Sequence, residues 1–342
     1  MKQVLAIAIF GVFLLNALIS NVSYKPLDSK NGNEPISKRK VTSEKFDLCA
    51  DVIGVTHPNA DVSVNYVFDK QLYEYGCENL SQVKFWRDIM NLTKDMAIIN
   101  VANYRHQVLC LPVKEWNEMD ELTKCNLKDS VRTVFELDSS HSIYMTSGKK
   151  FFYDFDNAFK QIERGINAFI ENGVDPWYAQ SILLIESPNK LQKSNAGAYG
   201  PFQLMKGVAR MYGLKVSRSL DERADFDRAA FAASSLIKNI CIPKTIEILD
   251  TLGISDYNQH DLWFRLLVMH TYHAGAGNVK AALNKIQPQQ GGMDLIQQLW
   301  FTETKHFKSA SQNYSQLVMA AHLEMNKRLG LEADNSIEIS SN

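Results

Sequence analysis

The feature that most constrains the fold is an apolar helix expected over residues 175–186, DPWYAQSILLIE. Asp175 is suited to cap its N-terminus, and Pro176 suits the first helical position, where no backbone N–H is needed. Apolar side chains recur on one face, at Tyr178, Ile182 and Ile185. Pro188 disfavours the α conformation for the residue before it, so the helix is predicted to end near Glu186.

This helix carries a carboxylate, that of Glu186, at its C-terminal end. The side chain is expected near the partial negative charge of the helix terminus and among the apolar residues 183–185. Both features disfavour the charged form, so we expect a raised pKa for Glu186. A carboxylic acid that stays protonated near neutral pH is the proton donor that a glycosidic oxygen requires.

A glycine-containing segment, GAYGPFQLM, follows at residues 197–205. Its two turn-forming glycines are Gly197 and Gly200. Pro201 predicts the start of a second helix that runs to Gly213. Gln203 and Met205 are then expected in its first turns, where the amide can bond to sugar groups and the thioether can form an adaptable apolar wall.

Three ordered blocks of residues are informative together. They are Glu186-Ser187, the loop Ser194 … Gly197-Ala198-x-Gly200 … Gln203-x-Met205, and Tyr272-x-Ala274-Gly275-x-Gly277-Asn278-Val279. Together they resemble the signature of family 1 lytic transglycosylases, the goose-lysozyme-like enzymes that cleave peptidoglycan. Within that family the chain is most similar to the membrane-bound D type. The resemblance covers residues 155–328.

The resemblance implies a lysozyme-like catalytic domain in which Glu186 is the single general acid and base. Asn313-Tyr314 is similar to the family's last motif, whose tyrosine points at the catalytic glutamate, which makes Tyr314 the second catalytic candidate. The implied substrate-binding residues are Ser187, Ser194, Gly197, Ala198, Gln203, Met205, Tyr272, His273, Ala274 and Gly275.

The implied substrate is the glycan strand of peptidoglycan, cleaved at the β-1,4 bond between N-acetylmuramic acid and N-acetylglucosamine. Glu186 would protonate the glycosidic oxygen and then, as a carboxylate, accept the proton of the muramic acid 6-hydroxyl. That hydroxyl attacks its own anomeric carbon, so a 1,6-anhydro sugar forms without water. The family needs no cofactor, and the sequence contains no cofactor motif. His270 and His273 have a spacing that a metal site could use, but no third ligand is found at a suitable distance in the sequence.

Two alternatives stay open. The first is a hydrolytic muramidase on the same fold, which needs a second carboxylate, with candidates at Asp221, Glu222, Asp225 and Asp227. The second is a non-catalytic wall-binding or scaffold protein, because the family has Asn where this chain has His273. The Glu-Thr-Arg that often precedes the last motif is also replaced, by residues 310–312.

The N-terminus is predicted to direct export. An apolar run reaches Ile19, so residues 1–20 are either a signal peptide or an uncleaved anchor that associates the chain with a membrane. The expected location is the periplasm or cell envelope. Residues 21–45 are polar and predict a flexible linker.

The remaining chain predicts an α+β fold that is mainly helical. Residues 46–154 are expected to form a smaller α+β region, with strands at 95–103 and 106–113, a helical pattern over 115–137 and a hairpin at 142–155. Residues 155–330 are expected to form the all-helical domain, and 331–342 a polar tail.

Charge and cysteine content limit the partners and the cross-links. The formal net charge is −1 and no Lys/Arg-rich run occurs, so no nucleic-acid partner is expected. We expect the thiols to be scattered and buried, and a single disulfide among them stays an open alternative. Because the number of cysteines is odd, at least one has no partner for a disulfide within the chain. The five cysteines are Cys49, Cys77, Cys110, Cys125 and Cys241.

Overall fold

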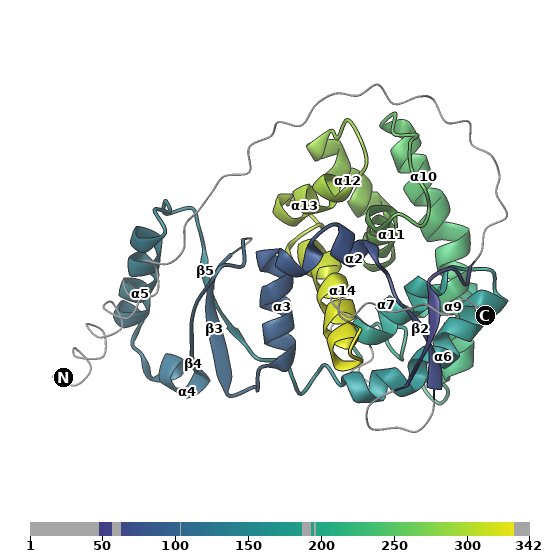
Figure 1. The fold of residues 1–342 in the computed structure, drawn as a ribbon, viewed down its shortest axis with the longest axis horizontal. Coiled ribbons are helices and arrows are strands. Elements are labelled where there is room, and N and C mark those ends of the chain that lie inside the picture. Colours follow the sequence, from purple (N-terminus) through teal and green to yellow (C-terminus); the bar gives the residue numbers. More distant parts are fainter. Residues whose placement is uncertain (1–47, 57–62, 103, 187–192, 195, 332–342) are drawn as a thin grey trace. The chain divides into compact units, whose positions relative to one another are not determined.

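A buried helix, α7 (Pro176–Glu186), lies inside the helical part of the molecule. All of its side chains from Pro176 to Ile185 are buried. A helix that is apolar on all sides is stable only where other elements cover all sides. Here α6 (Phe155–Glu171) and α14 (Ser309–Arg328) pack on it, as does a strand of the N-terminal region (Figure 1). The computed structural model describes residues 48–331, except 57–62, 103, 187–192 and 195.

The other helices surround this centre. They are α8 (Lys206–Met211), α9 (Phe226–Leu236), the π-helical turn η3 (Ile237–Cys241), α10 (Ile242–Thr251), α11 (Leu262–Ala274), α12 (Ala276–Ile286) and α13 (Met293–Phe301). Small residues on α9, among them Ala229 and Ala233, are fully buried and allow close contact between helices.

The first part of the N-terminal region packs directly on the helical part. Strands β1 (Val52–Thr56) and β2 (Ser63–Val67) pair antiparallel. The side chain of Gln180 on α7 accepts a hydrogen bond from the Val67 N–H and donates one to the Val67 carbonyl, both at 2.8 Å. After the short α2 (Gln71–Glu74) and the turn η1 (Cys77–Asn79), helix α3 (Ser81–Asn91) lies along α14.

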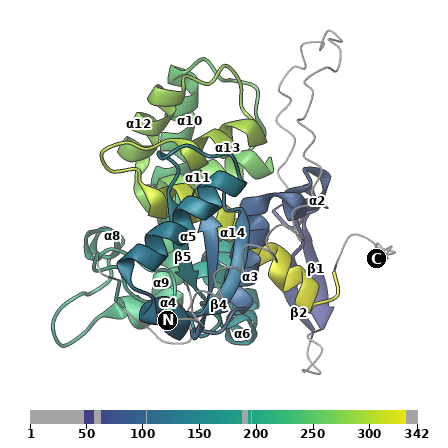
Figure 2. The same ribbon diagram turned by 90° about the vertical axis from the view of Figure 1, so that its left-hand side faces the viewer.

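A second sheet forms a separate layer beyond α3. Its strand order is β4-β3-β5, with β3 (Met96–Val101) paired antiparallel to β4 (Gln107–Pro112) and to β5 (Ile143–Ser147). Helices α4 (Val113–Glu118) and α5 (Glu121–Val134) lie on the side of this sheet away from α14 (Figures 1 and 2). Strand alternation places Ile98 in the larger core and Ile99 in a smaller core under α4 and α5.

The mainly helical α+β class is confirmed. Most of the predicted helices are also present, as are the two strands predicted at 95–103 and 106–113, which are β3 and β4. The predicted helix over 115–137 is two helices, because Asp120 accepts a hydrogen bond from the Thr123 N–H and starts α5 afresh. The predicted hairpin at 142–155 is wrong, because β5 pairs with β3 rather than with the residues that follow it. The strand pair β1–β2 was not predicted.

A further correction concerns the helix expected to start at Pro201. Helix α8 begins at Lys206, and residues 201–203 form a turn. Gln203 has a positive φ of 44°, which is incompatible with a right-handed helix. Gln203 therefore lies in the loop before α8, and Met205 is the N-terminal cap residue of that helix.

The larger core takes side chains from both sides of residue 154, where the sequence suggests a division between two regions. Phe85 and Trp86 belong to it together with residues of α6, α7 and α14, and the described residues fall in one compact unit. The predicted N-terminal segment, linker and tail lie outside the described residues. Within the described part of the chain, no helix is both long and apolar enough to cross a membrane.

The described part of the chain, which holds all five cysteines, contains no disulfide. Cys77 and Cys241 are buried, as expected of scattered core thiols. Cys49, Cys110 and Cys125 are exposed, which differs from the expectation of buried thiols.

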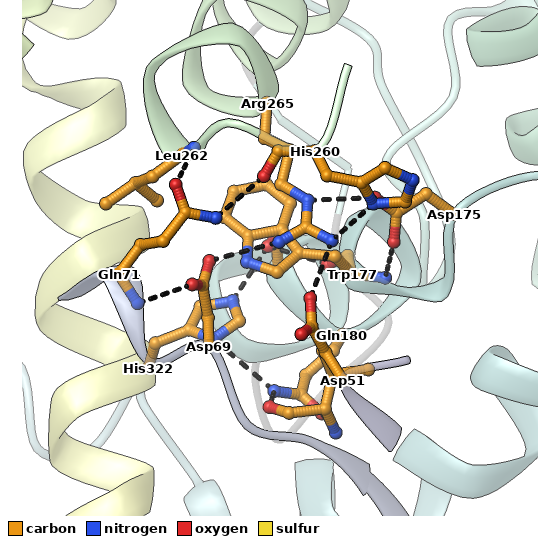
Figure 3. Close-up of polar contacts among 12 residues, drawn as sticks. Asp51, Asp69, Gln71, Asp175, Trp177, Gln180, His260, Leu262, Arg265 and His322 are labelled. Carbon is orange, nitrogen blue, oxygen red and sulfur yellow. Dashed lines mark hydrogen bonds and ion pairs between the residues drawn. The ribbon is translucent and has the colours of Figure 1, made fainter. Parts of the chain in front are cut away.

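A buried guanidinium, that of Arg265 on α11, joins three segments of the chain (Figure 3). Its Nε bonds to Asp175 Oδ2 at 2.8 Å, its Nη1 lies 3.3 Å from Asp69 Oδ2, and its Nη2 lies 2.9 Å from Asp51 Oδ2. Burial lowers the pKa of Arg265, but the three carboxylates outweigh it and raise the pKa above its usual value. Arg265 therefore ties the strand pair and α2 to the start of α7.

Replacement of Arg265 should destabilise the fold strongly. In Arg265→Met the carboxylates of Asp69 and Asp175 would stay buried without their cation, at a cost of about 3–5 kcal/mol. Arg164→Met is the matched control, because the pair Arg164–Asp227 is exposed and should contribute less than about 1 kcal/mol. Urea denaturation followed by circular dichroism measures both values. Equal losses in the two variants would contradict this account.

Candidate active site

The carboxyl group of Glu186 lies at the last residue of α7 and faces α14. The Tyr314 hydroxyl donates a hydrogen bond to Glu186 Oε1 at 3.1 Å. Tyr314 is only 3% exposed, so packing fixes its ring and with it the position of the donor. The two residues are far apart in the sequence, and the packing of α14 on α7 brings them together.

The Glu186 carboxyl is largely shielded from water, although the residue keeps some exposure, and no cation among the described residues acts on it. Burial raises its pKa to about 7, and the hydrogen bond from Tyr314 opposes this with a smaller effect, because it stabilises the carboxylate. The direction agrees with the prediction from the sequence, where the apolar neighbours were one of the two reasons given. Near neutral pH a substantial fraction of Glu186 is protonated and able to donate.

The C-terminal end of α11 forms the second side of the site. The Tyr272 hydroxyl donates to the Phe202 carbonyl at 2.6 Å and so connects α11 to the loop before α8. Burial raises the pKa of Tyr272 well above its usual value, and the charge of Glu186 raises it further, which places the two groups close together. Tyr272 is therefore a neutral donor already bonded to the loop backbone.

His273 stacks on the ring of Tyr314. The ring centroids are 4.1 Å apart and the planes differ by 21°. Desolvation by the surrounding protein lowers the pKa of His273 to about 4. The side chain is partly open to solvent, which weakens this effect, but the imidazole is still neutral at pH 7. A neutral imidazole beside Tyr314 offers one donor and one acceptor to a ligand.

The loop before α8 is held by Arg223, a residue that the sequence did not single out. Its Nη1 donates to the carbonyls of Gly197 and Leu204, each at 2.9 Å, and its other nitrogens pair with Asp221. Gly200 has a φ of 85°, and a Cβ there would lie 1.7 Å from the Arg223 carbonyl oxygen. Only glycine fits, so this glycine is required by close backbone packing.

The remaining predicted binding residues shape the same loop and the break after α11. The Ser194 hydroxyl accepts from the Ala198 N–H at 3.0 Å, and Gln203 Nε2 donates to the Gly200 carbonyl at 2.9 Å. Met205 is 46% exposed. Ala274 ends α11, and Gly275, with a φ of 82°, connects it to α12. Ser187 lies outside the described residues.

The four carboxylates considered for a second catalytic role all have structural partners. Asp221 pairs with Arg223, Glu222 with Arg228, and Asp227 with Arg164. Asp225 accepts from the Arg228 N–H and caps α9. The hydrogen bonds and cations beside Asp221, Glu222 and Asp227 hold the pKa of each below its usual value.

The pair His270 and His273 is not arranged as a metal site. His270 is fully buried, its Nε2 lies 2.9 Å from Ser315 Oγ, and burial lowers its pKa to about 3. Among the residues that the structure describes, no three side chains of His, Cys, Asp or Glu are grouped to hold a metal ion.

In comparisons with known proteins, no family model and no curated protein matches this chain.

Removal of the Tyr314 hydroxyl should raise the pKa of Glu186 further. In Tyr314→Phe the carboxylate loses its hydrogen-bond donor while its burial remains. The protonated form of Glu186 is therefore favoured more strongly over the carboxylate. Tyr272→Phe is the matched control, because that hydroxyl bonds to the Phe202 carbonyl and should leave the pKa nearly unchanged. Infrared difference spectroscopy of the protonated carboxyl band measures this, with Glu186→Gln to assign the band. A lower pKa in Tyr314→Phe would contradict the assignment.

Proposed function

We propose that this protein is a peptidoglycan lytic transglycosylase with a lysozyme-like catalytic domain. The observation that carries the proposal is the carboxyl group of Glu186, which is shielded, has a pKa of about 7 and is held by Tyr314. It lies beside the loop and the helix end that resemble the glycan-binding blocks of that enzyme family.

The proposed reaction uses one residue as acid and then as base. Protonated Glu186 gives its proton to the glycosidic oxygen as the bond from that oxygen to the anomeric carbon breaks. The Glu186 carboxylate then takes the proton of the muramic acid 6-hydroxyl, whose oxygen bonds to the same carbon. A pKa near 7 suits both steps, because proton transfer in each direction is then nearly balanced.

The Tyr314 hydroxyl has two uses in this scheme. Its hydrogen bond fixes the orientation of the Glu186 carboxyl, and it stabilises the carboxylate that exists between the two proton transfers. His273 would contact the glycan through its exposed edge, in place of the asparagine of the resembling family.

The hydrolytic alternative requires a carboxylate free to activate water or to act as nucleophile. The four candidates at positions 221–227 are engaged with arginines or with a helix N-terminus, which favours the single-acid reaction. Export to the periplasm or cell envelope is part of the proposal, because the substrate is found there.

The product of the reaction tests the proposal. Purified sacculi treated with the protein should release muropeptides one water lighter than reducing muropeptides, as mass spectrometry would detect. Glu186→Gln should release none, because the amide cannot donate a proton, whereas Asp227→Asn should release the same products as the unchanged protein. Reducing ends would point to the muramidase, and binding without any product would point to the wall-binding protein.

The pH dependence of the rate tests the role of Glu186 as an acid. The free carboxyl must be protonated to act, so kcat/KM should fall as the pH rises through about 7. Initial rates of product release from sacculi on both sides of that pH measure the effect. A rate that rises through this range would contradict an acid role for Glu186.

A further inference from the structure

An exposed group of aromatic rings lies outside the residues of the candidate site. It consists of Tyr104, His106, His141 and Phe301, and we call it the Tyr104 platform. Tyr104 is 42% exposed and Phe301 43%. The rings of Tyr104 and His106 lie 6.2 Å apart and differ by 10°, and those of Tyr104 and His141 lie 5.9 Å apart and differ by 25°.

The platform joins two parts of the chain. Tyr104 and His106 lie between β3 and β4, and His141 precedes β5, whereas Phe301 ends α13. The Phe301 ring lies 5.3 Å from that of Tyr104. Near-parallel rings about 6 Å apart are offset-stacked, so each ring covers only part of its neighbour, and Tyr104 keeps 42% of its surface exposed.

Clustering distinguishes these rings from ordinary exposed aromatic residues. Phe85, Trp86 and Trp116 of the same region are at most 9% exposed and belong to the cores. A single exposed aromatic side chain needs no explanation, but several together on one surface indicate a binding site.

The backbone that presents the platform is strained. Arg105 has a positive φ of 55° although it is not glycine. The Arg105 guanidinium is buried, lies over the Phe85 and Trp86 rings at 5.1 and 5.3 Å, and bonds to Asn100 Oδ1 at 3.0 Å. Because Arg105 is buried, its neighbours Tyr104 and His106 are left at the surface. Backbone strain of the kind seen at Arg105 is retained mainly where function requires it.

Arg105, the residue between Tyr104 and His106, also contacts the helix that carries Tyr314. Arg105 Nη2 donates to Asn313 Oδ1 at 3.3 Å. The next residue on α14 is Tyr314, which bonds to Glu186. The platform and the carboxyl group are therefore connected through two consecutive residues of one helix.

We propose that the Tyr104 platform binds sugar rings of the glycan strand at a distance from the bond that Glu186 cleaves. This inference rests on the proposed function. The C–H face of a pyranose ring carries partial positive charge and packs on the negative face of an aromatic ring. Burial lowers the pKa of His106, so its neutral imidazole can bond to sugar hydroxyl or acetamido groups.

The charged side chains beside His141 have partners within the protein. Arg132 Nε donates to the His141 carbonyl at 2.9 Å and its Nη1 pairs with Asp129, while Asp138 Oδ1 lies 3.2 Å from His141 Nδ1. An uncharged sugar chain is suited to such a surface. The platform would give the N-terminal α+β region a part in the choice of substrate, through preference for long strands.

Oligomers of β-1,4-linked N-acetylglucosamine test the proposal by calorimetry, in the Glu186→Gln background so that none is cleaved. Tyr104→Ala should weaken binding of the hexamer about tenfold. Binding of the trimer, which fills only the sites around residue 186, should stay within about twofold. Tyr104→Phe keeps the ring and should bind the hexamer as the parent does.

Tyr75→Ala is the matched control, since Tyr75 is 49% exposed and lies near Asp261, at the opposite end of α11 from Tyr272. Equal hexamer affinities of Tyr104→Ala and Tyr75→Ala would overturn the proposal. It would also be overturned if Tyr104→Ala lost as much affinity for the trimer as for the hexamer, or if the parent did not bind the hexamer. Digestion of sacculi by Glu186→Gln would instead overturn the proposed function, and a length-dependent loss in Tyr104→Ala would still support the platform.

Discussion

The structure depends on the ion cluster around Arg265. Burying a guanidinium costs desolvation free energy. Here its ion pairs with Asp51, Asp69 and Asp175, which lie in three separate segments of the chain, compensate that cost. Burial raises the pKa of Asp69 to about 6 in spite of this cation, which reflects how little water reaches the cluster. Any packing that separated the strand pair from α7 would leave these charges unpaired, so the cluster favours one arrangement of the chain over its alternatives.

The two ends of α7 show how a partner decides the effect of burial. At the N-terminus, burial alone would raise the pKa of Asp175, but Arg265, His260 and the Trp177 N–H together hold it below its usual value. At the C-terminus the Tyr314 hydroxyl is the partner of Glu186 and no cation of the described part of the chain acts on it, so burial prevails and raises the pKa to about 7. The same helix therefore carries a carboxylate with a lowered pKa at one end and one with a raised pKa at the other.

The N-terminal region is part of the same construction. Its strand pair completes the environment of α7 through Gln180, and its second sheet reaches α14 through Arg105 and Asn313, one residue before Tyr314. Of the aromatic residues there, Phe85, Trp86 and Trp116 pack in cores and Tyr104 is exposed. Their composition alone favours core packing for each of them, and the tertiary structure leaves Tyr104 at the surface.

The sequence by itself determined the local elements: apolar periodicity and the residues Asp175 and Pro176 set α7, and the apolar residues before Glu186 predicted its raised pKa. It failed where pairing or packing overrides local signals, at the hairpin expected after Gly148 and at the helix expected from Pro201, where close packing of Gly200 on Arg223 imposes a turn. The tertiary structure alone decided that Tyr314 reaches Glu186 and that the candidate second carboxylates are engaged with arginines or with the N-terminus of α9. These contacts join residues distant in the sequence, and their energies depend on burial and partners that no local pattern contains.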